Sequence, residues 1–148
     1  MKTFADIADR ARELYAAGAL PTRQWTVQVI CDHLAKAMTG STGVLGPGPG
    51  GGTLPMYLRV AGRFLVITCG VIPNGRKSPE RVMPRADVTW EDAINALDIA
   101  AALCRRKAQG EEPWLVHPML GFSDARTWQR FHVVHARHHF RCLRVPGP

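Results

Sequence analysis

The residues best suited to chemistry are concentrated near the end of the chain, where "FHVVHARHHFRCL" (residues 131–143) holds four of the six histidines. Other residues interrupt the histidines, unlike the continuous run of a purification tag. In a helix each residue turns about 100° from the previous one, which places His135 and His139 together at the centre of one face. His132 and His138 fall toward opposite margins of that face.

The histidine face of this helix is also its apolar face, so the rings are expected to point into the protein interior. Its members are Trp128, Phe131, His132, His135, His138, His139 and Cys142. The opposite side carries Arg126, Arg130, Arg137, Arg141 and Arg144. Burial disfavours the charged imidazolium and leaves a neutral ring with a free nitrogen lone pair. Two such rings at positions i and i+4 can bind one metal ion at about 2.1 Å from each nitrogen, so the spacing predicts a metal site rather than ordinary packing.

Two histidines elsewhere could supply a third ligand. His33 is central to the interior-facing stripe of a second expected helix, which also carries Thr26, Val29, Ile30 and Ala37. His117 lies in "LVHPML", directly before Pro118, where a loop is expected and a local hydrogen bond is the simpler role. The predicted metal ligands are therefore His33, His135 and His139.

Three neutral imidazoles suit a divalent ion such as Zn²⁺, Ni²⁺ or Fe²⁺ and leave coordination positions open. Structural zinc sites normally use four protein ligands, so an open site indicates catalysis or ligand binding. An ion held in this way makes a bound water acidic or activates an incoming thiol.

Two stretches carry a family resemblance: "QWTVQVICDHLAKAMTG" and, much later, "HPMLGFSDARTWQRFHVVHARHHFRCL". Together they resemble the DinB/YfiT-like superfamily of metalloenzymes, and specifically a branch without an assigned reaction. The resemblance implies an antiparallel four-helix bundle whose metal is held by one histidine of the second helix and an HxxxH pair of the last. By motif, these are again His33, His135 and His139. Characterised members include thiol-dependent transferases and an isomerase.

The chain departs from the family pattern three residues after the final ligand, where Cys142 replaces the usual glutamine. The support of the site is therefore expected to differ from that of relatives. A thiolate ligand from Cys142 is one alternative, and a reduced packing cysteine is the favoured one.

Helical periodicity and capping residues predict an all-α fold, with long helices at residues 3–18, 26–40, 89–110 and 123–143. The expected N-caps are Thr3, Thr26 and Thr89, and the expected stops are Gly18, Gly40 and Gly110. Residues 56–70 are expected to form a short helix, with a strand as the alternative. Glycine and proline at 41–55 predict a loop or a lid, and 71–87 reads as a turn-rich connector. Together these elements indicate one domain, residues 1–148, built as an antiparallel four-helix bundle.

Composition limits the expected partners and location. The net charge of +7 raises a nucleic-acid interpretation, but the arginines of the last helix are better explained as its solvated face. No stretch reaches the roughly 20 apolar residues of a membrane span. The N-terminal stretch carries acidic residues rather than a signal core, which makes the cytoplasm the expected location. The expected partner is a small-molecule substrate or a thiol cofactor, with a homodimer as an open alternative.

Two classes of function remain open. The first is a metal-dependent hydrolase or thiol-dependent transferase, and the second is a non-catalytic bundle that binds a metal or a small ligand. A proton-transfer group near the ion would favour the enzyme. The candidate is Asp32, but it lies about 100° around the helix from His33 and is expected to be a solvated or helix-turn partner rather than a base.

Overall fold

The computed structural model of the chain describes residues 1–44, 55–73, 79–110 and 114–147. The described part is mostly helical, which confirms the all-α prediction. The helices are α1 (Phe4–Ala16), α2 (Val27–Ser41), α3 (Met56–Arg63), α4 (Trp90–Gln109) and α5 (Ala125–Phe140). The shorter elements are strand β1 (Leu20–Pro21), the π-helical turn η1 (Phe64–Thr68), the 3-10 turn η2 (Glu80–Val82) and strand β2 (Leu143–Arg144).

Side-chain caps begin helices α1, α4 and α5, but not α2. Thr3 accepts a hydrogen bond from the backbone N–H of Asp6 in a complete capping box at the start of α1. Thr89 accepts from the backbone N–H of Asp92 at the start of α4. Both caps were predicted from the sequence. Thr26 occupies the expected position before α2, although its hydroxyl makes no capping bond there.

Several expected helix ends are displaced. Helix α2 runs through Gly40 to Ser41, since one glycine inside a helix costs only about 1 kcal/mol. Helix α5 begins after Asp124, whose carboxylate accepts from the backbone N–H of Thr127, rather than at Ser123. It ends at Phe140, because the residues beyond it turn away to pair with β1.

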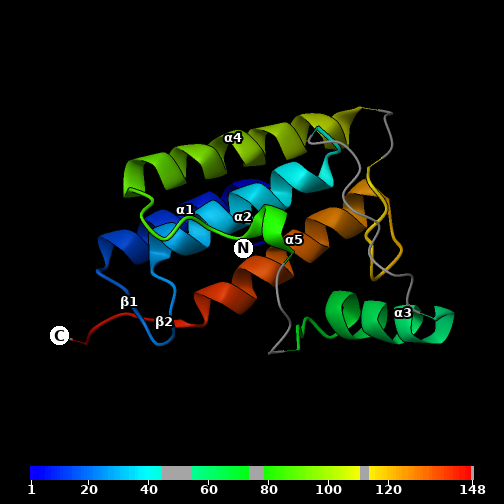
Figure 1. The fold of residues 1–148 in the computed structure, drawn as a ribbon, viewed down its shortest axis with the longest axis horizontal. Coiled ribbons are helices and arrows are strands. Elements are labelled where there is room, and N and C mark those ends of the chain that lie inside the picture. Colours follow the sequence, from blue (N-terminus) through cyan, green and yellow to red (C-terminus); the bar gives the residue numbers. More distant parts are fainter. Residues whose placement is uncertain (45–54, 74–78, 111–113, 148) are drawn as a thin grey trace.

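Helices α1, α2, α4 and α5 pack against one another around the core (Figure 1). In this view α2 and α4 run in the same direction and α5 runs in the opposite one. Apolar residues at helical spacing make this packing possible: the buried positions of α1 are Phe4, Ile7, Ala8, Ala11 and Leu14. The core continues on α4 through Ala93, Leu97, Ala100, Ala101 and Cys104.

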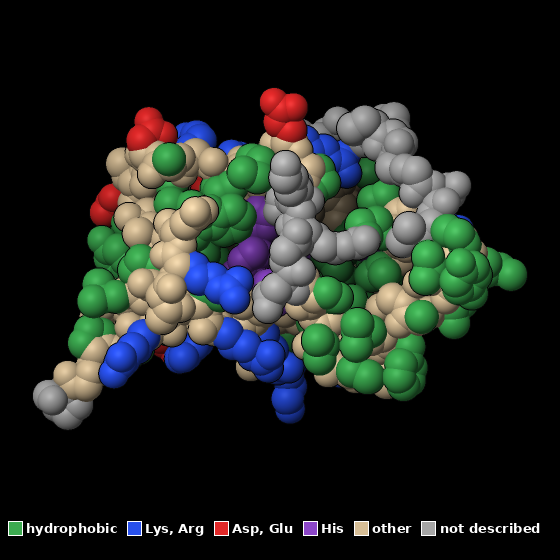
Figure 2. Space-filling model, turned by 60° about the horizontal axis from the view of Figure 1, so that its bottom comes forward, with side chains coloured by type: hydrophobic (Ala, Val, Ile, Leu, Met, Phe, Trp, Pro, Cys, Tyr) green, Lys and Arg blue, Asp and Glu red, His purple; other side chains and the backbone are tan. Residues whose placement is uncertain are grey.

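The short helix expected at 56–70 forms as α3 continued by η1, and the strand alternative is wrong. Helix α3 buries none of its side chains, and hydrophobic side chains gather at this end of the molecule (Figure 2). No helix in the described ranges is long and apolar enough to cross a membrane. Of the loop expected at 41–55, residues 45–54 lie outside the described residues, and Ser41 belongs to α2.

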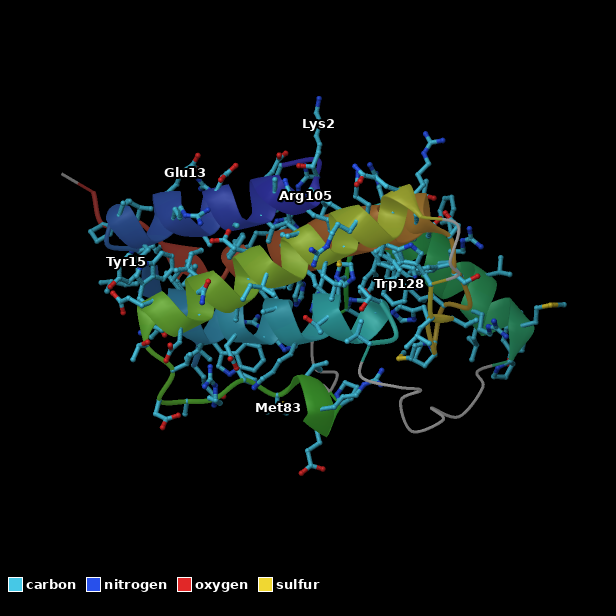
Figure 3. All side chains as sticks on the ribbon, turned by 90° about the horizontal axis from the view of Figure 1, so that it is seen from above. Lys2, Glu13, Tyr15, Met83, Arg105 and Trp128 are labelled. Carbon is cyan, nitrogen blue, oxygen red and sulfur yellow. The ribbon has the colours of Figure 1, made fainter. Side chains whose placement is uncertain are left out.

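Two segments distant in the sequence lie against α2 and α5. Strand β1 pairs with β2, and both the N–H and the hydroxyl of Thr22 donate to the Cys142 carbonyl. This pairing holds the residues before α2 beside the end of α5. Residues 79–85, called the strap below, run along α2 on the side away from α1, as the position of Met83 shows (Figure 3).

Candidate metal centre

The imidazole rings of His33 on α2 and of His135 and His139 on α5 converge on one point. The Nε2 atom of His135 lies 3.2 Å from Nε2 of His33 and 3.0 Å from Nε2 of His139. One ligand atom of each ring lies within 4.8 Å of the other two, and among the described residues these three form the group able to hold a metal ion. The structure therefore brings together the three predicted residues.

The spacing of these nitrogens matches what a shared ion requires. Ligands at about 2.1 Å from an ion, separated by 90–109°, lie about 3.0–3.4 Å from each other. The two short Nε2 separations, 3.2 and 3.0 Å, fall within that interval. The third pair, His33 and His139, lies within 4.8 Å, so the packing of α2 against α5 brings the three nitrogens close to the spacing of a shared site.

The position of the proton on the His33 ring also suits metal binding. Nδ1–H of His33 donates to the Val82 carbonyl over 2.7 Å, which leaves Nε2 of His33 with its lone pair facing the cluster. Without an ion, the short contact between His33 and His135 requires a proton on Nε2 of His135, because Nε2 of His33 presents a lone pair. With an ion, all three Nε2 lone pairs are used. Nδ1 of His135 is buried without a described partner, which costs about 1–3 kcal/mol.

Burial keeps the cluster neutral. It lowers the pKa of His33 below its ordinary value and lowers that of His139 to about 3. The pKa of His135 is held well below its ordinary value by burial and then by the neighbouring rings of His139 and His33. Neutral imidazoles are the form that binds metal, so the site needs no deprotonation near pH 7.

Trp25 encloses the cluster on one side. Its ring centroid lies 5.0 Å from that of His33 and 5.4 Å from that of His139, with the latter pair stacked. Phe131 lies 5.6 Å from His135. The cluster is also partly open to solvent: His135 and His139 are partly exposed, and Figure 2 shows histidine side chains in a recess, with Lys and Arg side chains nearby. The arrangement combines apolar walls with access from solvent.

Asp32 is buried, because its side chain is only 3% exposed. The prediction that it would be solvated is therefore wrong. Its carboxylate accepts from Lys36 Nζ at 2.8 Å and from Arg85 through both the backbone and the guanidinium. Burial raises the pKa of this carboxyl, but the hydrogen bonds from Lys36 and Arg85 outweigh that effect and hold the pKa below its ordinary value. Asp32 is thus an ionised, fully partnered group and not a free base.

The remaining histidines have other roles. His117 accepts hydrogen bonds at Nδ1 from the backbone N–H groups of Met119 and Leu120, as a local loop partner was expected to do. His132 is buried, and its Nε2 bonds to the Ser41 hydroxyl, which itself donates to a backbone carbonyl. His138 stacks edge-on against His139 without joining the converging nitrogens.

Cys142 likewise lies outside the converging set: its thiol donates to the carbonyl of His138. This placement favours the packing role over the thiolate ligand. Two contributors were not predicted from the sequence, the Val82 carbonyl and the ring of Trp25. The tryptophan could have been suspected, since it precedes α2 within the motif that contains His33.

Fold and site together define a helical protein with a candidate three-histidine metal centre. The chain belongs to the family described as "Protein of unknown function (DUF1569)", whose model matches residues 2–145. No curated protein and no solved structure matched the chain. None of these comparisons links it to the DinB/YfiT-like superfamily, so that resemblance stays a prediction.

Proposed function

We propose that the chain is a metal-dependent enzyme that acts on a small molecule, either as a hydrolase or as a thiol-dependent transferase. The single observation that carries the proposal is the convergence of three neutral imidazole nitrogens at metal-binding distances. With three protein ligands, positions remain for water or substrate, which is the usual arrangement of catalytic rather than structural sites.

In this proposal the chain is one domain, a DinB-like four-helix bundle of α1, α2, α4 and α5 in which α5 runs antiparallel to α2 and α4, and His33, His135 and His139 hold Zn²⁺, Ni²⁺ or Fe²⁺. When bound, such an ion supplies Lewis acidity toward water, a thiol or a carbonyl. The residues of the chain orient the site: Val82 fixes the ring of His33, and Trp25 and Phe131 exclude water from one side.

A second candidate function is a non-catalytic metal-binding protein. Asp32 favours it, because the carboxylate nearest in sequence to a ligand is already engaged by Lys36 and Arg85 and is not free to move a proton. If the protein is an enzyme, a proton released during the reaction would therefore have to be accepted by the substrate or by a group at an open metal position.

Metal analysis of untagged protein, purified without a nickel column, tests the proposal. The expected result is one divalent ion per chain, lost in His139→Ala. A panel of ester, amide and thiol-acceptor reactions then separates the two candidates. Turnover that depends on the bound ion and disappears in His139→Ala supports the enzyme, whereas stoichiometric metal without turnover supports the binding protein. Wild-type protein that binds no divalent metal contradicts both.

A further inference from the structure

Hydrogen bonds join the strap to residues 32–36 of α2, a stretch that includes a candidate metal ligand. Resting on the proposed metal centre, we infer that Asp32, Lys36 and Arg85 form a clamp that positions His33. The clamp holds the strap against α2, so that the Val82 carbonyl stays in place to receive Nδ1–H of His33.

Asp32 is the centre of the clamp. Its Oδ2 atom accepts from the backbone N–H of Arg85 at 2.9 Å and from Lys36 Nζ at 2.8 Å. Its Oδ1 atom accepts from Nη2 and Nε of the Arg85 guanidinium at 3.0 and 3.2 Å. One buried carboxylate thereby binds both the main chain and the side chain at the end of the strap.

Lys36 adds a second connection. Located one helical turn after Asp32, it donates to the Met83 carbonyl at 2.9 Å as well as to the carboxylate. The strap is therefore bonded to α2 at Val82 through His33, at Met83 through Lys36, and at Arg85 through Asp32. On α2 the ligand His33 lies between the clamp residues Asp32 and Lys36, and on the strap both clamp bonds follow Val82 within three residues.

These contacts bear on metal binding because of the tautomer of His33. A histidine ligand is normally oriented by an acceptor at its second ring nitrogen, and loss of that acceptor typically weakens metal affinity 10–100-fold. Here the acceptor is a backbone carbonyl on an irregular segment, which must itself be held in place. The buried pairing with Arg85 and Lys36 supplies this hold, since a carboxylate with 3% exposure cannot be left unpaired without loss of stability.

The clamp could instead serve only to stabilise the fold, and the experiment must distinguish the two roles. Arg85→Met removes the guanidinium and keeps an apolar side chain of similar reach. Arg81→Met, in the same segment, is the matched control, because Arg81 is exposed and its charge is lost in the same way. Arg85→Lys is the conservative variant, which keeps the charge but not the two-pronged geometry.

The first readout is the protonation of the His33 ring nitrogens in metal-free protein, observed by two-bond ¹H–¹⁵N correlation spectra. In wild type and in Arg81→Met, Nδ1 should carry the proton. In Arg85→Met, the two tautomers should mix. The second readout is Co²⁺ affinity and the Co²⁺ absorption spectrum: affinity should fall about 10–100-fold in Arg85→Met with a changed spectrum, and Arg85→Lys should recover part of it.

Folded Arg85→Met protein that keeps a single Nδ1–H tautomer and wild-type Co²⁺ affinity would overturn the inference. If Arg85→Met does not fold, Lys36→Met replaces it, since Asp32 then keeps Arg85 while the bonds of Lys36 to the Met83 carbonyl and to Asp32 are lost. The same two readouts apply, and unchanged values again overturn the clamp. Wild type that binds no Co²⁺ refutes the proposed metal centre, while the tautomer measurement still decides whether the clamp positions His33.

Discussion

Nδ1 of His33 donates to the Val82 carbonyl over 2.7 Å, although the two residues are 49 positions apart in the chain. The bond links the middle of α2 to an irregular segment and sets the direction of the opposite ring nitrogen. The candidate metal ligand His33, supplied by α2, is therefore oriented by a residue of the strap.

Replacement of His33, His135 or His139 by alanine should abolish stoichiometric binding of a divalent ion, because two imidazoles rarely hold such an ion tightly. Metal content of dialysed protein, measured by mass spectrometry, checks this. His138→Ala is the control, since His138 lies outside the converging nitrogens. Retention of full metal by the His33 variant together with its loss from the His138 variant would show that the ligand set is wrong.

His132→Ala should lower stability without removing metal. The ring is buried, stacks on Trp128 and bonds to Ser41, so its loss leaves a cavity and removes the donor to the Ser41 oxygen, whose hydroxyl keeps its bond to a backbone carbonyl. A decrease of about 2–4 kcal/mol in the free energy of unfolding is expected. Urea unfolding of metal-free protein measures it. An unchanged midpoint, or a loss of metal comparable to that of His139→Ala, would contradict the assignment.

Metal-free protein should lose stability as the pH falls below about 6.5. Burial lowers the pKa of His132 from 6.5 to about 3. Between these two pH values the imidazole of His132 is protonated in the unfolded chain and neutral in the folded one. Stability is then fully present above pH 6.5 and declines toward pH 3, by about 1.4 kcal/mol per pH unit for each such group. Urea midpoints at several pH values, in the presence of a chelator, check the sign. His132→Asn should flatten the slope, and stability that rises on acidification would refute the burial argument.

Addition of Zn²⁺ to metal-free protein should raise the melting temperature, and a chelator should reverse the effect. An ion that binds only the folded state at 100 times its Kd adds about 2.7 kcal/mol. Differential scanning calorimetry measures the shift, with His135→Ala as the matched control. An equal shift in that variant would place the bound ion elsewhere.

Much of this arrangement could be predicted from the sequence because its signals are local. The caps at Thr3 and Thr89 follow from residue type, and the pairing of His135 with His139 follows from helical periodicity. His33 could be added because it lies on an interior stripe of a second helix. In each case the relevant neighbours are within a few residues.

The parts that could not be predicted depend on distant contacts. The strap was predicted only as part of a turn-rich connector, because its bonds to α2 use backbone groups, which carry no signature in the sequence. Asp32 looked solvated, because its partner Arg85 is 53 positions away. The early end of α5 likewise depends on the pairing of β2 with β1.

The three candidate ligands carry no formal charge, and the adjacent carboxylate of Asp32 is already neutralised by Lys36 and Arg85. A dication held by His33, His135 and His139 would therefore keep its full charge beside the apolar ring of Trp25. In such surroundings charges interact more strongly than in water. Selection among small molecules would then depend first on charge sign, with anions such as carboxylates or thiolates favoured over neutral analogues of the same shape.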